Sequence, residues 1–244
     1  PAGWDIPQEE DIAMAILTQM SPYMLSADPD RFDYLRAYWD LSELTAADFA
    51  YWRENYLTYL KRVTYKDPLR RQLVLKSPVN TLRIPILLEL FPDAKFVCIQ
   101  RNPYDVFNSS VHLRQTLMLE NCLGRPELRD LEESIYWVHE FVFRTYQRDR
   151  DLIPSGHLHE IRFEDVEADP VGQLQQVYRA LDLGGWDEMR EIIEPQVPAL
   201  RRYKKNVFQD TPERMQRIYD RLEFIFEHYG YPSPMEAAAE HAAA

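Results

Sequence analysis

The stretch that decides the fold runs Leu75-Lys76-Ser77-Pro78, then Phe91-Pro92-Asp93-Ala94-Lys95-Phe96, then Arg101-Asn102-Pro103-Tyr104-Asp105-Val106, with Ser109 three residues further on. The apolar run 72–76, halted by Ser77-Pro78, predicts a buried strand. A second buried strand is predicted at 95–99, directly before Arg101. Lys76 and Arg101 are therefore expected at the carboxyl ends of strands, where α/β sheets bind ligands.

Helices are expected between these strands. Asn102 is a favourable N-cap, and Pro103 suits the first helical position after it. A third strand is predicted at 157–163. The other expected helices cover 45–60, 84–90, 127–150, 170–181, 187–194 and 212–229. Strands separated by helices pair in parallel through right-handed crossovers, so the sequence predicts an α/β layered sheet in a single domain over 1–235, with a tail at 236–244.

Composition excludes several classes of protein. The chain has 244 residues with 40 acidic and 28 basic side chains, a net charge of −12. This balance argues against a general nucleic-acid binder, which needs a basic surface. Cys98 and Cys122 are too few for a disulfide scaffold or a thiolate metal site. No apolar run approaches the ~20 residues that span a bilayer, so the chain is expected to be cytoplasmic and not transmembrane.

Arg101 has two possible roles. Its guanidinium can grip a phosphate with two parallel hydrogen bonds, and the N-terminus of the following helix offers free N–H groups to an anion. Alternatively, Arg101 pairs with a carboxylate at the edge of the sheet. Spacing alone leaves both roles open.

The whole combination resembles the sulfotransferases, and within them the microbial-type branch, over roughly residues 72–115. The matching elements are strand-Lys-Ser-Pro, Phe-Pro-Asp-Ala-Lys-Phe, and Arg-x-Pro with a Ser eight residues after the Arg. The resemblance implies a P-loop-NTPase-like, three-layer αβα fold with a central parallel sheet. It also implies transfer of a sulfuryl group from 3′-phosphoadenosine 5′-phosphosulfate (PAPS) to a hydroxyl or amine of a small molecule, lipid or carbohydrate. The product nucleotide is adenosine 3′,5′-bisphosphate (PAP), and no metal is required.

The resemblance also implies which residues bind the nucleotide. Arg101 and Ser109 correspond to the pair that holds the 3′-phosphate. The segment 203–208 resembles a stretch beside the loop that closes over this phosphate. Four cations lie within this segment or directly before it: Arg201, Arg202, Lys204 and Lys205. Such a run is usually a solvated face. An acidic protein that binds a polyanion nevertheless needs a local concentration of positive charge, which favours ligand contact.

The catalytic candidates are Lys76, Glu9 and Glu10. Lys76 corresponds to a lysine that neutralises charge at the bridging oxygen as the sulfuryl group leaves. Some relatives carry a His shortly after it, where this chain has Asn80, which cannot act as a base. Glu9 and Glu10 are candidates for the general base on an early helix. Helix first turns favour acids anyway, so at least one of the two is expected to be structural. His112 is the second candidate for the base.

One departure from the family leaves alternatives open. The 5′-phosphosulfate loop, Pro-Arg-Ser-Gly-Thr-Thr, is an anion nest of backbone N–H groups and is not found in this sequence. We expect it upstream of Pro1. Otherwise the chain is a non-catalytic nucleotide-binding or interaction module that retains only the 3′-phosphate half of the site. A nucleoside or sugar kinase is disfavoured because no Gly-x-x-x-x-Gly-Lys-Ser/Thr motif is present.

Overall fold

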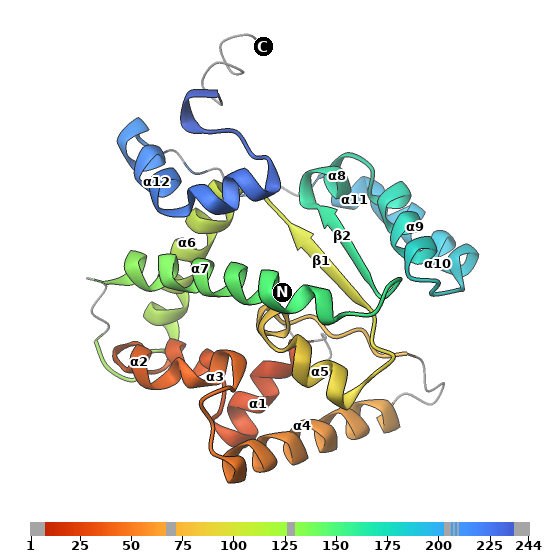
Figure 1. Cartoon of the computed structure of the whole chain (residues 1–244). Coiled ribbons are helices and arrows are strands. Elements are labelled where there is room, and N and C mark those ends of the chain that lie inside the picture. The colour runs from red at the N-terminus through yellow and green to blue at the C-terminus, as the bar shows by residue number, and fades with distance from the viewer. Residues whose placement is uncertain are drawn as a thin grey trace. The chain divides into compact units, whose positions relative to one another are not determined.

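The computed structural model describes residues 8–66, 72–125, 130–202, 206, 208 and 210–236 (Figure 1). The predicted contacts of Lys204 and Lys205 and most of the predicted tail therefore lie outside the described residues. The chain divides into two compact units. The first unit comprises Pro1–Arg83 and Leu113–Ser134, and the second comprises Ile84–His112 and Ile135–Ala244. The single domain expected over 1–235 stays a prediction.

The described elements of the first unit are helical. They are α1 (Glu10–Thr18), η1 (Pro22–Ser26), η2 (Pro29–Arg31), α2 (Phe32–Leu35), α3 (Ala37–Asp40), α4 (Ala46–Lys66) and η3 (Pro78–Leu82), with the second half of α6 (Pro103–Asn121) and the start of α7 (Leu131–Asp149).

Helix α4 begins and packs as the sequence predicts. The Asp48 amide donates to Thr45 Oγ1 at 3.1 Å, which satisfies one of the free N–H groups of the first turn. Trp52 and Tyr56, one turn apart, are fully buried, and their rings stack with centroids 4.8 Å apart. Helix α1 packs on α4 and buries Met14 completely. This aromatic core supports the first turn of α1.

The second unit combines helices with a small sheet. Besides the remainder of α6 and α7, its elements are α5 (Ile84–Leu90), β1 (Phe96–Gln100), η4 (Arg150–Leu152), β2 (Leu158–Arg162), α8 (Phe163–Ala168), α9 (Pro170–Ala180), α10 (Trp186–Ile193), η5 (Glu194–Gln196), α11 (Val197–Leu200) and α12 (Pro212–Tyr229).

Strands β1 and β2 pair in parallel, with Phe96 opposite Leu158. Alternate side chains of a strand point to opposite faces. On one face, Phe96 and Leu158 pack against the cluster of Ile84, Tyr146 and Ile153. On the other face, Ile161 of β2 packs with Val177 and Leu181 from α9 and the residue that follows it. The structure therefore has a mixed α/β architecture in which helices pack on both faces of β2.

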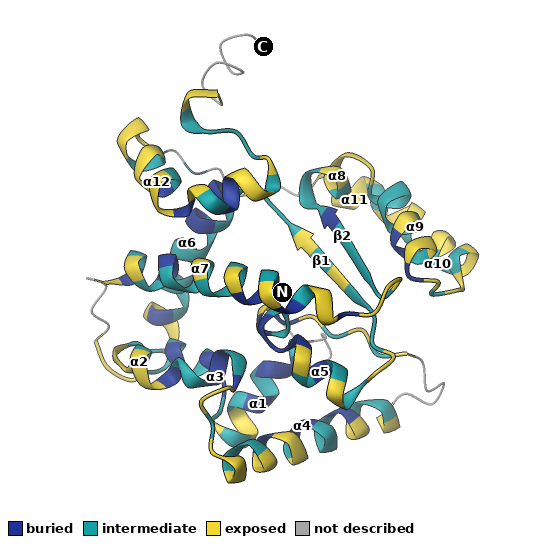
Figure 2. Ribbon diagram, viewed as in Figure 1, coloured by how far each residue is buried: buried dark blue, intermediate teal, exposed yellow. Residues whose placement is uncertain are grey.

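The exposure of β1 differs from that of β2. Val97 and Ile99 are 45% and 62% exposed, and Figure 2 shows exposed positions along this strand. Among the described residues the sheet has these two strands only. The three-layer αβα arrangement with a central sheet stays a prediction.

The predicted strand at 72–76 is wrong, because residues 72–77 lie outside any helix or strand. A strand needs a neighbouring backbone to receive its hydrogen bonds. In the described part of the chain β1 pairs with β2 and with no segment near Lys76. Val74 is 92% exposed, so the apolar run that we interpreted as buried is not buried. The strands expected at 95–99 and 157–163 are confirmed within a residue or two.

The helix predictions are confirmed where the structure describes them, including α7, α9, α10 and α12. Asp169 caps α9 by accepting a hydrogen bond from the Gly172 amide at 3.0 Å. Thr211 caps α12 through the Arg214 amide. Within the described ranges, no helix combines the length and the apolar composition that crossing a membrane requires.

Candidate active site

The N-cap and the first turn of α1 carry three consecutive carboxylates, and each one meets a polar side chain from the segment 76–83 of the same unit. Their burial increases from one to the next, from a partly exposed Glu9 to a fully buried Asp11. The partners are, in order, Lys76 for Glu9, Asn80 for Glu10 and Arg83 for Asp11.

Asp11 and Arg83 form a buried ion pair. Their side chains are 1% and 2% exposed, and Arg83 Nη1 lies 2.6 Å from Asp11 Oδ1. Arg83 also donates to the backbone carbonyls of Tyr38 and Trp39, at 2.7 and 3.1 Å. The other Asp11 oxygen accepts a hydrogen bond from the Ser21 hydroxyl. Buried charges are stable only when they are paired and hydrogen-bonded in this way, so the pair anchors α1.

Glu10 is buried, with 3% of the residue exposed. Asn80 Nδ2 donates to its carboxylate at 2.5 Å. Burial and the charge of Glu10 raise the pKa of Tyr56 and of Tyr59, so both phenols stay neutral. Of the two predicted base candidates, Glu10 is the one that packing shields from a substrate.

Glu9 differs from Glu10 in its surroundings. It is the N-cap residue of α1, but its side chain does not cap the helix. The carboxylate instead accepts hydrogen bonds from Lys76 Nζ on one oxygen and from the Tyr23 hydroxyl on the other. The Glu9 side chain is 16% exposed and that of Lys76 is 79% exposed. The structure therefore brings together two of the predicted catalytic residues, Glu9 and Lys76. Glu9 is the most accessible of the three consecutive carboxylates.

The second unit holds the predicted 3′-phosphate residues. Arg101 Nη2 donates to Asp105 Oδ2 at 3.1 Å, and its guanidinium lies 4.5 Å from the centre of the Phe163 ring. Arg101 Nε is buried and has no hydrogen-bond partner among the described residues. An orphan donor of this kind is costly unless a ligand satisfies it. Arg101 therefore does pair with a carboxylate, that of Asp105, which was one of the two roles that its position in the sequence left open. This contact uses Nη2 and leaves Nε without a partner among the described residues.

The N-terminus of α6 is less open than we expected from the sequence. The Asn102 amide donates to Glu164 at 3.0 Å, and the Tyr104 amide donates to the Asn102 side chain at 3.0 Å. Burial disfavours the charge on Glu164, but hydrogen bonds from backbone amides and from the Tyr231 hydroxyl outweigh it and hold the pKa of Glu164 below its usual range. An internal carboxylate and the cap therefore occupy two amides that we had expected to be free for a ligand.

Ser109 lies on α6, half-buried, and its hydroxyl has no hydrogen-bond partner in the part of the chain that the structure describes. The neighbouring Asn108 is bound to Asp210, and Arg214 donates to Asn108 Oδ1 at 3.1 Å. These contacts tether the segment before α12 to α6, beside Ser109.

The basic segment is only partly described. Arg201 and Arg202 are exposed in the turn that follows α11. A few residues later, the Phe208 ring lies 6.3 Å from the ring of His112, which is one helical turn beyond Ser109. Phe208, which follows the four cations in the sequence, therefore lies near the part of α6 that carries Ser109 and His112. His112, the second candidate for the base, is exposed and has an aromatic neighbour.

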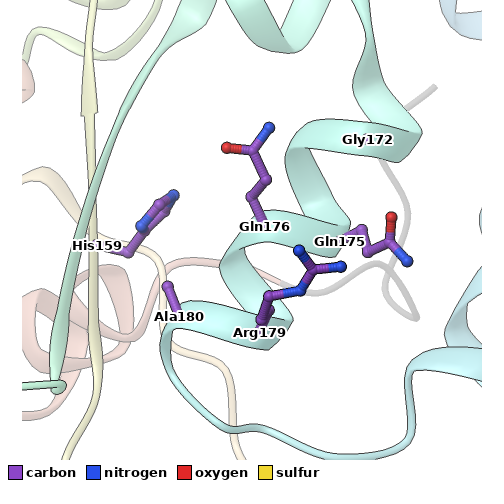
Figure 3. A pocket seen from close by; sticks show the side chains of 6 residues that line it. All are labelled: His159, Gly172, Gln175, Gln176, Arg179 and Ala180. Atoms are coloured by element: carbon purple, nitrogen blue, oxygen red, sulfur yellow. The ribbon is translucent and has the colours of Figure 1, made fainter.

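One pocket of the described part of the chain lies apart from the predicted site residues. It has a volume of about 510 Å³ and lies between β2 and α9, and its lining includes His159, Gln176 and Arg179 (Figure 3). None of the predicted site residues lines it. The described ranges contain no cluster of three or more His, Cys, Asp or Glu side chains that could hold a metal ion.

Sequence reasoning missed Tyr23, Asp11 and Arg83. Two signals were available. Asp11 directly follows the two predicted base candidates, and Arg83 is a single cation within the apolar run from Leu82 to Leu88. A charge in such a run needs a buried partner of opposite sign. Tyr23 begins an aromatic-rich stretch, residues 23–39, that could line an acceptor pocket or be buried, but no sequence signal indicated its contact with Glu9.

Comparison with known proteins identifies the class to which this fold and these clusters belong. The model of the sulfotransferase family matches residues 16–188, more than half of the chain, and the chain therefore belongs to the sulfotransferase family. Two curated relatives, from Mycobacterium bovis and Mycobacterium tuberculosis, are each named omega-hydroxy-beta-dihydromenaquinone-9 sulfotransferase. Each is 29% identical to this chain over 225 residues, which cover 92% of the chain and 58% of the relative.

A further relative is an uncharacterized protein from Aquifex aeolicus. It is 20% identical over 179 residues, which cover 69% of this chain and 22% of the relative. The chain thus spans less than two thirds of the length of the curated relatives that it matches. No significantly similar solved structure was found.

Proposed function

We propose that the protein transfers a sulfuryl group from PAPS to a hydroxyl group on a lipid-like small molecule. Membership of the sulfotransferase family supports the reaction type. The two mycobacterial relatives are named for a hydroxylated menaquinone, which supports a lipid-like acceptor. A cytoplasmic location and the three-layer fold remain predictions that accompany this proposal.

The observation that carries the donor assignment is the orphan donor of Arg101. The buried Nε–H and the Ser109 hydroxyl are both without partners among the described residues, and both come from the motif that resembles the 3′-phosphate site. A phosphate supplies acceptor oxygens for both, and charge-assisted hydrogen bonds of this type are the strong ones. Arg101 and Ser109 therefore fit the 3′-phosphate of PAPS or PAP.

PAPS, when bound, supplies the sulfuryl group and a nucleotide leaving group. Glu9 then accepts the proton of the acceptor hydroxyl, because its carboxylate is partly exposed while that of Glu10 is enclosed. Lys76 carries positive charge beside Glu9, where it can neutralise negative charge that develops during transfer. Lys76 thus has two roles: it orients the base and it supplies electrostatic stabilisation.

Lys76 also favours a hydroxyl over an amine as acceptor. An aliphatic amine is protonated at neutral pH and would bring a second ammonium beside that of Lys76. Like charges at contact distance repel each other, whereas a neutral hydroxyl does not pay this cost. The non-catalytic alternative, a module that keeps only nucleotide binding, gives no role to the contact between Glu9 and Lys76.

The test is turnover by the natural gene product with PAPS and two acceptors of equal chain length, a long-chain primary alcohol and the corresponding amine. Mass spectrometry detects the sulfate ester or the sulfamate. We expect the ester to predominate. Glu9→Gln should lower kcat by about 10²–10⁴, because a positioned base contributes that much. Its affinity for PAP should stay unchanged.

Glu10→Gln is the matched control, since the same change is made one residue away. It should keep kcat close to wild type, with a lower melting temperature because the side chain is buried. If both variants keep full turnover while His112→Ala loses it, the base lies on α6 and the assignment of Glu9 is wrong. If PAP binds but neither acceptor is sulfated, the non-catalytic module is the better account.

A further inference from the structure

Tyr23 shares the carboxylate of Glu9 with Lys76. Its hydroxyl donates to Oε2, while Lys76 Nζ reaches Oε1, so one donor is bound to each carboxylate oxygen. A carboxylate offers about four acceptor positions. Two therefore remain for an incoming hydroxyl, and the two donors decide where those positions point.

The backbone that carries Tyr23 is tied to the helix that carries Glu9. Ser21 Oγ accepts a hydrogen bond from the Tyr23 amide at 3.1 Å, and the same hydroxyl donates to the buried Asp11. Ser26 Oγ donates to the Tyr23 carbonyl at 2.8 Å. Pro22 opens η1 and fixes the backbone immediately before Tyr23. These contacts hold Tyr23 in a fixed position relative to α1.

We propose that Tyr23 is a positioning residue for the catalytic base, an inference that rests on the proposed role of Glu9. Its hydroxyl prevents the partly exposed carboxylate from rotating about its terminal bonds, so that a free acceptor position stays aimed at the substrate. Tyr23 is neutral. It can therefore orient Glu9 without adding a second charge beside that of Lys76.

An orienting role and a packing role predict different kinetics. Loss of an orienting contact lowers kcat and leaves the KM for PAPS nearly unchanged, because the nucleotide does not depend on the direction of the carboxylate. A tyrosine that merely supported packing would lower the rate only in proportion to the folded fraction of the protein.

The test is Tyr23→Phe in the natural gene product, which removes the hydroxyl and keeps the ring. We expect kcat to fall about tenfold, in line with the loss of one hydrogen bond to a charged group. The KM for PAPS should change by less than about twofold. Tyr65→Phe is the matched control, since Tyr65 is 88% exposed on α4, and it should behave like the wild type.

A double-mutant cycle separates this inference from the proposed function. With Glu9→Gln in place there is no carboxylate to orient, so Tyr23→Phe should lower kcat by less than about twofold further. The inference is overturned if Tyr23→Phe keeps the wild-type kcat. It is also overturned if the loss of kcat only follows a smaller folded fraction, or if Tyr23→Phe lowers kcat as much in the Glu9→Gln protein as in the wild type. If Glu9→Gln itself retains full turnover, the assignment of the base has failed and the role of Tyr23 fails with it.

Discussion

The predicted site residues of the first unit differ from those of the second unit in how their charged groups are satisfied. In the first unit, the carboxylates of Glu9, Glu10 and Asp11 each have a partner from the segment 76–83. In the second unit, Arg101 and Ser109 have donors that no described residue satisfies. A carboxylate that already has partners is held in position, whereas a cation with an unsatisfied donor is suited to bind an anion.

Burial separates the roles within the first cluster as well. Asp11 and Arg83 are almost inaccessible, while Glu9 and Lys76 meet solvent. We therefore expect the buried pair to stabilise the first unit, and we propose the chemistry for the accessible pair. Burial does not separate two roles in this way in the second unit, because the one residue Arg101 is both ion-paired with Asp105 and partly accessible.

The largest effect we predict is on stability in the first unit. Arg83→Met should lower the free energy of unfolding by about 3–5 kcal/mol, because it leaves the carboxylate of Asp11 buried without its cation. Urea unfolding followed by circular dichroism at pH 7 measures the change. Asp11→Leu combined with Arg83→Met should recover part of the loss, since no unpaired charge then remains.

Arg190→Met is the control for this experiment. Arg190 pairs with Glu194 at 2.7 Å, but both side chains are about half exposed, so the change should cost less than about 1 kcal/mol. An Arg83→Met protein as stable as the Arg190→Met protein would contradict the anchoring role of the buried pair.

A smaller effect is expected from the basic cluster of Arg201, Arg202, Lys204 and Lys205. Replacing Arg201, Arg202, Lys204 and Lys205 by glutamine should weaken PAP binding by about tenfold and flatten its dependence on salt, because the attraction is electrostatic and screened. Titration calorimetry at two salt concentrations gives both quantities.

The matched control makes the same change in net charge on a different element. Arg53, Lys61, Arg62 and Lys66 are exposed on α4, and their replacement by glutamine should alter PAP affinity much less. If the two quadruple variants show the same affinity and salt dependence, only the net charge of the protein matters. The cluster would then be a solvated face.

The sequence predicted those features that depend on neighbouring residues. Caps and a starting proline located the beginnings of α4 and α6, because a cap needs only a side chain and an amide a few residues away. The motif from Lys76 to Ser109 indicated the family, which the comparisons confirm.

The features that sequence reasoning missed depend on distant residues. Arg83 and Asp11 are 72 positions apart, and no periodicity connects them. Glu9 and Glu10 are adjacent and chemically alike, so only their burial distinguishes them. The segment 72–76 has the composition of a strand, but pairing requires a neighbouring backbone that composition cannot reveal.

The most direct test of the central claim is to compare the binding of PAP and adenosine 5′-monophosphate, which lacks the 3′-phosphate, by calorimetry. We predict that Arg101→Ala weakens PAP binding more than tenfold, since a charge-assisted contact contributes about 1.5–3 kcal/mol. Binding of the monophosphate should change little, so that the two affinities converge. Arg144→Ala, which removes an exposed arginine of α7, should leave both affinities unchanged. If Arg101→Ala binds PAP as tightly as the wild type does, Arg101 does not hold the 3′-phosphate and the central claim is wrong.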